Sequence, residues 1–298
     1  MLSFEPITLP DRDWIDPLLK LSDFNTSEYT FANNYLWRNY YHFTRARFQD
    51  FYILRILPKG ECLSFLYPAG SGDVSAMVKE LHAHTKVVGC PLVFRGVTKE
   101  GVARLEAAFP GKFSFTPNRD AFDYLYESED LITLAGKKYH SKRNYINRFI
   151  TQNWAFEPLD SANLNECRVM NDEWCKQNHC GEDDSKAAEF EVVRMSLHEF
   201  EDLHLEGALL RLDGTVVAFT IGEPLNSDTY IVHIEKAFSD VDGAYPTINR
   251  EFAEHAAKNF RYINREEDTG AEGLRKAKLS YKPVELLEKY TAVLREEL

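Results

Sequence analysis

Long hydrophobic runs are missing from this chain. No window approaches the roughly 18 consecutive apolar residues that a membrane-spanning helix needs, although 44% of the 298 residues are hydrophobic. The start of the chain, Met1 to Pro6, also lacks the basic segment and the apolar stretch of a secretory signal. These two absences predict a cytoplasmic protein without an integral membrane segment.

Cysteine is scarce. The five cysteines are Cys62, Cys90, Cys167, Cys175 and Cys180. An odd, dispersed set is more typical of a reducing compartment than of a disulfide framework. Cys175, His179 and Cys180 are close enough in sequence to suggest a metal site, but no second pair of ligands follows at zinc spacing. We therefore expect no bound metal and interpret the segment as a helix end that carries ordinary thiols.

Positive charge is also in short supply. Asp and Glu outnumber Lys and Arg by 47 to 35, which gives a formal net charge of -12, and such a chain repels nucleic acid on average. Any contact with tRNA therefore needs a local basic patch. Five cations fall within twelve residues at Lys137, Lys138, Lys142, Arg143 and Arg148, with Tyr139 and Tyr145 between them. Cations interleaved with aromatic rings suit a phosphorylated ligand, and a solvated linker is the alternative.

Hydrophobic periodicity predicts the same order of elements in both halves of the chain. In the first half we expect strands at 4–8, 41–47, 51–57, 62–67, 91–95, 113–117 and 121–127, and helices at 11–20, 28–38, 73–86 and 99–109. In the second half we expect strands at 154–159, 207–212, 215–222, 229–236 and 261–264, helices at 163–177, 187–203, 246–260 and 271–281, and extended structure at 284–294. Asp213-Gly214 predicts a tight type I′ hairpin.

Both halves thus read β-α-α-β-β-β-α-β-α-β-β, which is the order of the acetyltransferase (GNAT) fold, an α/β fold with a mixed, splayed sheet and helices on both faces. A chain of 298 residues is long for one hydrophobic core and comfortable for two. We expect a first GNAT-like domain at 1–130, a connecting basic helix at 131–152 and a second GNAT-like domain at 153–298.

Two motifs carry a resemblance to a known family. They are Asp268-x-Gly270-x-x-Gly273-Leu274-x-x-x-Lys278-x-x-Tyr281 and the basic segment from Gly136 to Phe149. With them the chain resembles the family that contains the C-terminal domain of bacterial phosphatidylglycerol lysyltransferases and, more distantly, the Fem-type peptidyl transferases. Characterised members have two GNAT domains and transfer an aminoacyl group from tRNA. The resemblance therefore implies an aminoacyl-tRNA donor, while the acceptor, a small molecule or a lipid headgroup, cannot be read.

Acyl transfer needs positive charge where the tetrahedral oxyanion develops and a group that accepts the proton of the nucleophile. The resemblance implies Lys278 for the first role, on a helix whose other face, Leu274 and Tyr281, is expected to be core; a surface ion pair is the alternative. Asp268 either accepts the proton or caps the following helix. His233 lies two residues before Glu235 on one strand. We interpret it as a half-buried strand residue, and a role as proton carrier is the alternative.

The predicted substrate-binding residues come mainly from the basic segment. They are Lys137, Lys138, Tyr139, Lys142, Arg143, Asn144, Asn147, Glu235 and Arg275.

No coenzyme A cofactor is expected, because its pyrophosphate needs a glycine-rich loop with Gln or Arg before a helix. The segment from Phe238 to Pro246 has one glycine and two aspartates, and Gly70-Ser71-Gly72 follows Tyr67 and precedes Asp73, typical of a turn and helix cap. P-loop, dinucleotide-binding and nucleophile-histidine signatures are absent. The sequence predicts aminoacyl transfer, with coenzyme A dependent N-acyl transfer and non-catalytic ligand binding as alternatives.

Overall fold

Two compact units make up the protein in a computed structural model that describes residues 2–296 and 298. The first unit contains the chain up to Asp123, Glu267–Glu272 and the segment from Leu286 onward. The second contains Tyr124–Glu266 and Gly273–Glu285.

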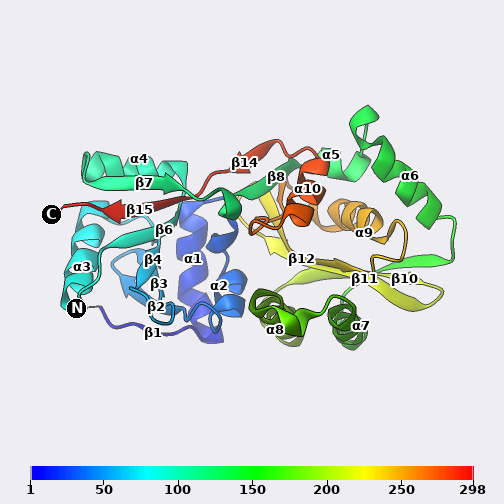
Figure 1. Ribbon diagram of the computed structural model, residues 1–298, viewed down its shortest axis with the longest axis horizontal. Helices are drawn as coiled ribbons and strands as arrows, with labels where there is room; N and C mark the ends of the chain where they lie inside the picture. Colours follow the sequence, from blue (N-terminus) through cyan, green and yellow to red (C-terminus); the bar gives the residue numbers. More distant parts are fainter. Residues whose placement is uncertain (1, 297) are drawn as a thin grey trace. The chain divides into compact units, whose positions relative to one another are not determined.

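The first unit is built on a mixed sheet. Its strands lie in the order β1 (Glu5–Pro6), β2 (Thr44–Phe48), β3 (Phe51–Ile56), β4 (Ser64–Leu66), β6 (Val93–Val97), β15 (Tyr290–Leu294) and β7 (Phe113–Pro117), and β5 (Ala69–Gly70) pairs with β3. β4 and β6 run parallel, with Phe65 opposite Phe94. α1 (Arg12–Ser22) packs on β3 and β5 and contacts α2 (Phe31–Trp37), while α4 (Lys99–Ala108) contacts α3 (Val74–Val87) and packs on β6, β7 and β15 (Figure 1).

The second unit repeats this plan. Its strands lie in the order β14 (Glu285–Leu287), β8 (Asp123–Glu127), β13 (Tyr262–Asn264), β12 (Thr229–Ala237), β11 (Thr215–Pro224), β10 (Glu206–Leu212) and β9 (Trp154–Pro158). β12 and β13 run parallel, with Tyr230 opposite Ile263. α7 (Leu164–Gln177) and α8 (Asp184–His198) cover one face of β10–β12, and α9 (Ala244–Phe252) covers the other (Figure 1).

The order of elements predicted from the sequence is confirmed in both halves. The predicted hairpin is present as well, since Leu212 pairs with Thr215 and the two turn residues, Asp213 and Gly214, have φ of 50° and 81°. Both angles lie in the left-handed region that a type I′ turn requires.

The two sheets divide the chain differently from the expected boundaries at residues 130 and 153. The last strand, β15, lies between β6 and β7 of the first sheet, and β8 pairs antiparallel with β13 of the second sheet. Residues 124–152 therefore belong to the second unit, and residues from 286 onward belong to the first. Periodicity identifies a strand, but its hydrogen-bonding partner depends on distant residues.

The helix expected over 131–152 is interrupted in the structure. α5 (Ser128–Thr133) ends at Leu134, which has a left-handed φ of 48°. Gly136, with φ of 83°, precedes a 3-10 turn at Lys137–Tyr139, and α6 (His140–Phe149) follows. The basic segment is therefore a 3-10 turn followed by a short helix that is separate from α5, because a left-handed residue ends an α-helix.

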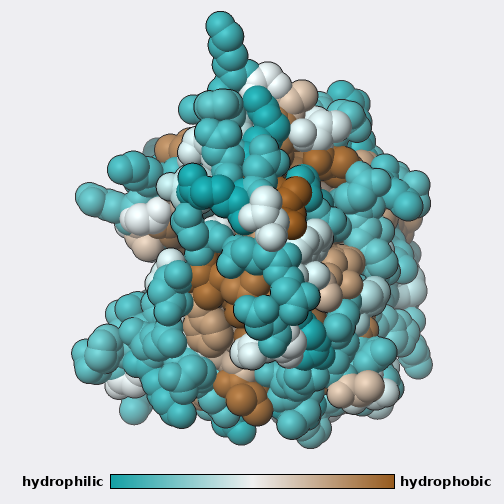
Figure 2. Space-filling model, turned by 90° about the vertical axis from the view of Figure 1, so that its right-hand side faces the viewer, coloured by the Kyte–Doolittle hydropathy of each residue, from teal (hydrophilic) through white to brown (hydrophobic). Residues whose placement is uncertain are grey.

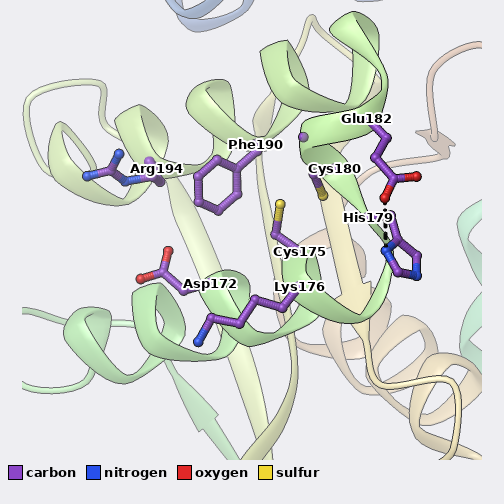
Figure 3. A pocket seen from close by; sticks show the side chains of 9 residues that line it. Asp172, Cys175, Lys176, His179, Cys180, Glu182, Phe190 and Arg194 are labelled. Atoms are coloured by element: carbon purple, nitrogen blue, oxygen red, sulfur yellow. Dashed lines mark ion pairs between the residues drawn. The ribbon is translucent and has the colours of Figure 1, made fainter.

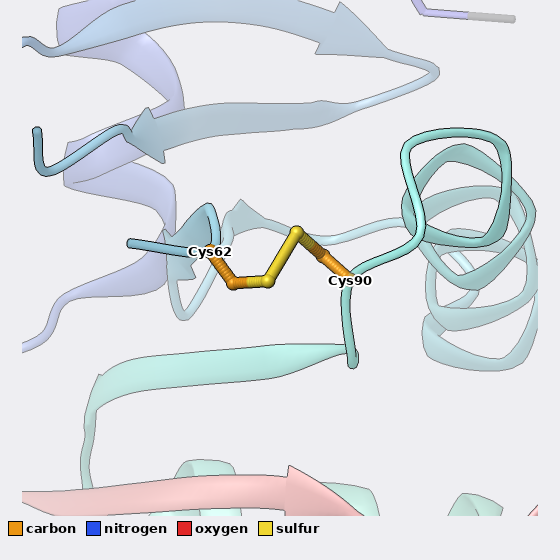
Figure 4. Close-up of a disulfide and its surroundings, with 2 residues drawn as sticks. All are labelled: Cys62 and Cys90. Atoms are coloured by element: carbon orange, nitrogen blue, oxygen red, sulfur yellow. A yellow bond between two sulfur atoms is a disulfide. The ribbon is translucent and has the colours of Figure 1, made fainter. Parts of the chain in front are cut away.

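The cysteines are not all free. Cys62 and Cys90, which are 28 residues apart, form a disulfide in the first unit (Figure 4), whereas Cys167, Cys175 and Cys180 are free thiols. The sequence did not predict this pair, because the spacing of two cysteines says nothing about their distance in the fold.

No helix in the described part of the chain is long and apolar enough to cross a membrane. The face of the protein in Figure 2 is mostly hydrophilic, and its hydrophobic patches are bordered by polar side chains.

Gly243 allows α6 to pack closely against the start of α9. A Cβ atom at Gly243 would lie 2.6 Å from the carbonyl oxygen of Tyr145 and 2.9 Å from Cβ of Phe149. Arg148 of α6 also forms an ion pair of 2.8 Å with Asp242, the residue before Gly243. The amino end of α9 is therefore covered by α6.

We predict that Gly243→Ala destabilises the protein more than Gly214→Ala. Both glycines have a positive φ, 88° at Gly243 and 81° at Gly214, which costs an alanine about 1 to 2 kcal/mol, but nothing lies within 4 Å of a Cβ at Gly214. The steric conflict at Gly243 should therefore add about 1 to 3 kcal/mol to the loss. Urea unfolding of both variants measures the difference, and equal losses would contradict the close packing of α6 on α9.

Candidate functional site

Lys278 lies on α10 (Glu272–Ser280) and is buried, with 8% of its surface exposed. Its Nζ donates to the carbonyl oxygens of Arg265 at 2.6 Å and Glu266 at 3.1 Å. The interpretation of Lys278 as a surface ion pair is therefore wrong. The expected core face of α10 is present only in part, because Tyr281 is buried but Leu274 is 43% exposed.

The backbone that Lys278 holds follows directly after β13 and is strained. Glu266 has a left-handed φ of 54°, a conformation that costs a residue with a side chain on the order of 1 to 3 kcal/mol. Its backbone N–H donates to Oδ1 of the buried Asn264 at 2.7 Å, while its carbonyl accepts from Lys278. Side chains thus hold the backbone of Glu266 through both its N–H and its carbonyl group.

Arg265 is the cation that this backbone presents. Its Nη2 donates to Glu235 at 2.8 Å, and its guanidinium lies 4.8 Å from the ring centroid of Tyr281 and 5.7 Å from that of Tyr126. Glu235 also accepts from the Asn249 side chain at 3.0 Å. Nη1 of Arg265 is buried and has no hydrogen-bond partner among the described residues. A buried N–H without a partner is costly, so this atom is suited to a ligand.

Lys142 approaches the same tyrosine from α6. Its Nζ lies 4.1 Å from the ring centroid of Tyr281. Burial lowers the pKa of Lys142, as does the charge of Arg265, while Glu235 acts in the opposite direction. Within residues 2–296 and 298, no hydrogen bond or ion pair holds its ammonium group. Lys142, Arg265, Glu235 and Tyr281, which we call the Tyr281 cluster, therefore combine two cations that have unused donors with one carboxylate.

Most of the other basic-segment residues stabilise local structure. Lys138 forms an ion pair of 2.7 Å with Asp130. The buried Tyr139 donates its hydroxyl to the carbonyl oxygen of Tyr281 at 2.8 Å. Arg143 donates to the carbonyl oxygens of Leu134 and Gly136, where α5 ends.

The remaining predicted binding residues lie outside the Tyr281 cluster. The Asn144 amide lies 3.1 Å from the imidazole of His140, Lys137 and Asn147 are exposed, and Arg275 is half-buried on α10. Of the predicted set, only Lys142 and Glu235 belong to the Tyr281 cluster. Arg265 was not among the predicted site residues, although a cation directly after a buried strand was a usable signal.

Asp268 belongs to the first unit and is fully buried. Its Oδ1 accepts from the backbone N–H of Gly270 at 2.9 Å, and its Oδ2 accepts from Arg119 at 3.2 Å. A side chain that accepts from the N–H two residues on forms an Asx turn. These contacts are those of a turn residue paired with an arginine, which favours the structural interpretation of Asp268 over that of a proton acceptor.

His233 is held between two carboxylates inside the second unit. Its Nδ1 lies 2.8 Å from Glu266 and its Nε2 lies 3.0 Å from Glu223. Burial alone would lower the pKa of His233, but the hydrogen bonds to Glu223 and Glu266 raise it to about 10. The imidazolium is therefore a structural ion at neutral pH, and both ring nitrogens are occupied.

Sequence reasoning missed a buried ionic cluster in the first unit. Nζ of Lys289, whose side chain is 1% exposed, lies 2.7 Å from Asp123 and 2.9 Å from Glu28. Nζ also donates to Oγ of Ser27 at 3.0 Å. These residues are far apart in sequence and sit in otherwise ordinary contexts, so no local pattern predicted the cluster.

Among the described residues, no three His, Cys, Asp or Glu side chains are placed to hold a metal ion.

The family model described as "Phosphatidylglycerol lysyltransferase, C-terminal" matches residues 19–293. The chain belongs to this family. A conserved protein of unknown function from Bacteroides thetaiotaomicron is 41% identical, and its crystal structure has a TM-score of 0.94 over 99% of this chain and 100% of that one. An uncharacterized protein of Mycoplasmoides gallisepticum is 24% identical over 56% of this chain and 54% of its own length. The chain thus spans about half the length of that curated relative.

More distant solved structures share the fold of this phosphatidylglycerol lysyltransferase C-terminal family member. L-PGS from Bacillus licheniformis is 18% identical, with a TM-score of 0.67 over 97% of this chain and 93% of that one. FemX is 10% identical, with a TM-score of 0.62 over 97% and 96%. A tandem GNAT protein from the clavulanic acid biosynthesis pathway is 8% identical, with a TM-score of 0.50 over both whole chains. The predicted tandem GNAT fold and the Fem-type similarity are confirmed.

We predict that His233 makes the stability of this family member depend on pH. Its pKa in the folded protein, about 10, is above the ordinary value of 6.5. The stabilisation is therefore complete below pH 6.5 and is lost as the pH rises through about 10, at up to about 1.4 kcal/mol per pH unit. Urea unfolding of the wild type and His233→Gln should show a difference that shrinks toward pH 10.

The matched control is His198→Gln, which changes an exposed histidine of the same unit. A difference between wild type and His233→Gln that stays constant from pH 6 to 10 would contradict the pairing of His233 with Glu223 and Glu266.

Proposed function

We propose that this protein is an aminoacyltransferase that moves an aminoacyl group from an aminoacyl-tRNA to an amine or hydroxyl acceptor. The observation that carries the proposal is the Tyr281 cluster, in which Arg265 Nη1 and the Lys142 ammonium both lack a hydrogen-bond partner among the described residues. Such donors suit the oxyanion of acyl transfer or a phosphate of the donor. Membership of the phosphatidylglycerol lysyltransferase C-terminal family supports the same class of reaction.

In this proposal Lys278 is a positioning residue. Its ammonium already donates to two carbonyl oxygens, and it fixes the backbone from which the Arg265 side chain extends. Arg265 then takes the role of oxyanion donor that the resemblance gave to Lys278. A buried donor that is held in place before the ligand arrives costs little reorganisation during the reaction.

The amino end of α9 does not favour coenzyme A as the donor. A pyrophosphate binds at a helix amino end through free backbone N–H groups, but α6 packs against Gly243 here. The neighbouring Asp242 also forms an ion pair with Arg148.

The corresponding end of α3 is closed as well. Oδ1 of Asp73 accepts from the N–H groups of Ser75 and Ala76 at 2.8 and 3.3 Å. A Cβ at Gly72 would lie 2.6 Å from the Phe51 ring. Both helix ends are thus occupied by atoms of the protein, which supports a donor without this pyrophosphate.

We predict that changes in the Tyr281 cluster lower the rate of transfer. Arg265→Lys should reduce kcat by about a hundredfold or more, because one N–H donor to the oxyanion contributes roughly 3 kcal/mol. Lys142→Met should also reduce turnover, whereas Lys137→Met, in the same segment but exposed, should behave like the wild type. Thermal unfolding of each variant separates lost chemistry from lost structure. Full activity of Arg265→Lys would exclude Arg265 as the oxyanion donor.

The donor can be identified directly with the purified protein. It is incubated with cell extract and either a set of radiolabelled aminoacyl-tRNAs or radiolabelled acetyl-coenzyme A. We expect label to leave an aminoacyl-tRNA only when active protein is present. Transfer from acetyl-coenzyme A alone would replace the proposal by coenzyme A dependent acyl transfer, and binding of a charged tRNA without turnover would indicate a non-catalytic module.

A further inference from the structure

A cavity of about 630 Å³ lies in the second unit, and none of the residues of the Tyr281 cluster lines it. It is formed by the end of α7, the turn that follows it and α8. Two free thiols, Cys175 and Cys180, line this cavity together with Phe190 and Arg194. In Figure 3 the sulfur atoms of the two cysteines point toward each other from opposite sides of the turn. The proposed transferase reaction uses none of these residues.

The chain between the two thiols is folded so that they face each other. His179 has a left-handed φ of 53°, which turns the chain back at the end of α7. The Asn178 side chain donates to the carbonyl oxygen of Trp174 at 2.8 Å. On the other side of the turn, the Asp183 carboxylate accepts from the backbone N–H of Ser185 at 2.9 Å. Both ends of the turn are therefore fixed, and the facing arrangement does not depend on a ligand.

The two thiols differ in exposure. Cys180 is 3% exposed, whereas Cys175 is partly exposed to the cavity. Burial raises the pKa of the Cys180 thiol to about 11, and a hydrogen bond with Cys175 adds to this effect. Because the thiolate is the nucleophile, the buried Cys180 is a poor first attacker. Cys175 is the thiol that a molecule in the cavity meets.

We propose that Cys175 and Cys180 form a dithiol modification site that a low-molecular-weight disulfide, such as glutathione disulfide, oxidises to an intramolecular disulfide. The Cys175 thiolate attacks one sulfur of the small disulfide, and the first small thiolate leaves. Cys180 then loses its proton and attacks Sγ of Cys175, which expels the second small thiolate. The two protons from the cysteines end on the two small thiols, so the protein dithiol is oxidised and the small disulfide is reduced.

The other cysteines cannot replace this pair. Cys167 is fully buried within α7 and does not line the cavity, and Cys62 is already bonded to Cys90 in the first unit. The chemistry is therefore specific to one turn of the second unit.

Intact-mass spectrometry of the full chain with glutathione disulfide tests the proposal. The wild type should lose two hydrogen atoms, retain no glutathione and yield a cross-linked peptide with Cys175 and Cys180. Cys180→Ser should retain one glutathione on Cys175, because the resolving thiol is gone. Cys175→Ser should stay unmodified, because Cys180 is buried. Cys167→Ser is the matched control and should behave like the wild type.

A second probe tests the facing geometry without oxidation. Phenylarsine oxide forms two As–S bonds with a pair of close thiols and releases water, so one equivalent should bind the wild type and Cys167→Ser but neither Cys175→Ser nor Cys180→Ser. Wild-type protein that keeps a glutathione adduct, or that remains unmodified while its urea-unfolded form reacts, would overturn the proposal. Binding of the arsenical to Cys175→Ser would do the same.

Discussion

The candidate site of this protein depends on one buried ammonium group. Lys278 donates to two consecutive carbonyl oxygens where the chain leaves β13, and a hydrogen bond that involves a charged group contributes about 1.5 to 3 kcal/mol. That free energy is of the size needed to hold Glu266 in its left-handed conformation. With the backbone of Glu266 fixed, its side chain reaches His233, while Arg265 reaches Glu235 and Tyr281. Lys278 thus positions the side chains of Arg265 and Glu266 through their backbone.

Residues 134–149 join the two halves of the sequence and supply Lys142, the second cation of the site. Leu134 and Gly136 break the helix, and α6 then packs on α9 at Gly243. This packing brings Lys142 to the Tyr281 ring. It also covers the helix end where a pyrophosphate would bind in a coenzyme A dependent relative of this fold. One packing contact therefore favours a site built from side-chain cations over a site built from backbone N–H groups.

Each unit contains buried cationic side chains that are paired with carboxylates. In the first unit Lys289 contacts Asp123 and Glu28. In the second unit His233 and Arg265 are each paired with glutamate. Removing a single partner from such a pair leaves an uncompensated buried charge and costs several kcal/mol. Arg265 differs from Lys289 and His233 because its Nη1 has no hydrogen-bond partner within residues 2–296 and 298, which makes it available to a ligand.

The sequence by itself determined the element order, because apolar periodicity and turn residues such as Asp213-Gly214 act locally. It also located the two segments, 136–149 and 262–282, that supply Lys142, Arg265, Lys278 and Tyr281. Only the tertiary structure decided the rest. It assigned β8 and β15 to their sheets and joined Cys62 to Cys90. It also buried Lys278 and placed Lys142 at the Tyr281 ring, whereas Lys138 and Arg143 of the same segment bind local partners. The reason is physical: strand partners, burial and charge pairing are set by residues far apart in the chain, and no local pattern of residue types records which of them meet.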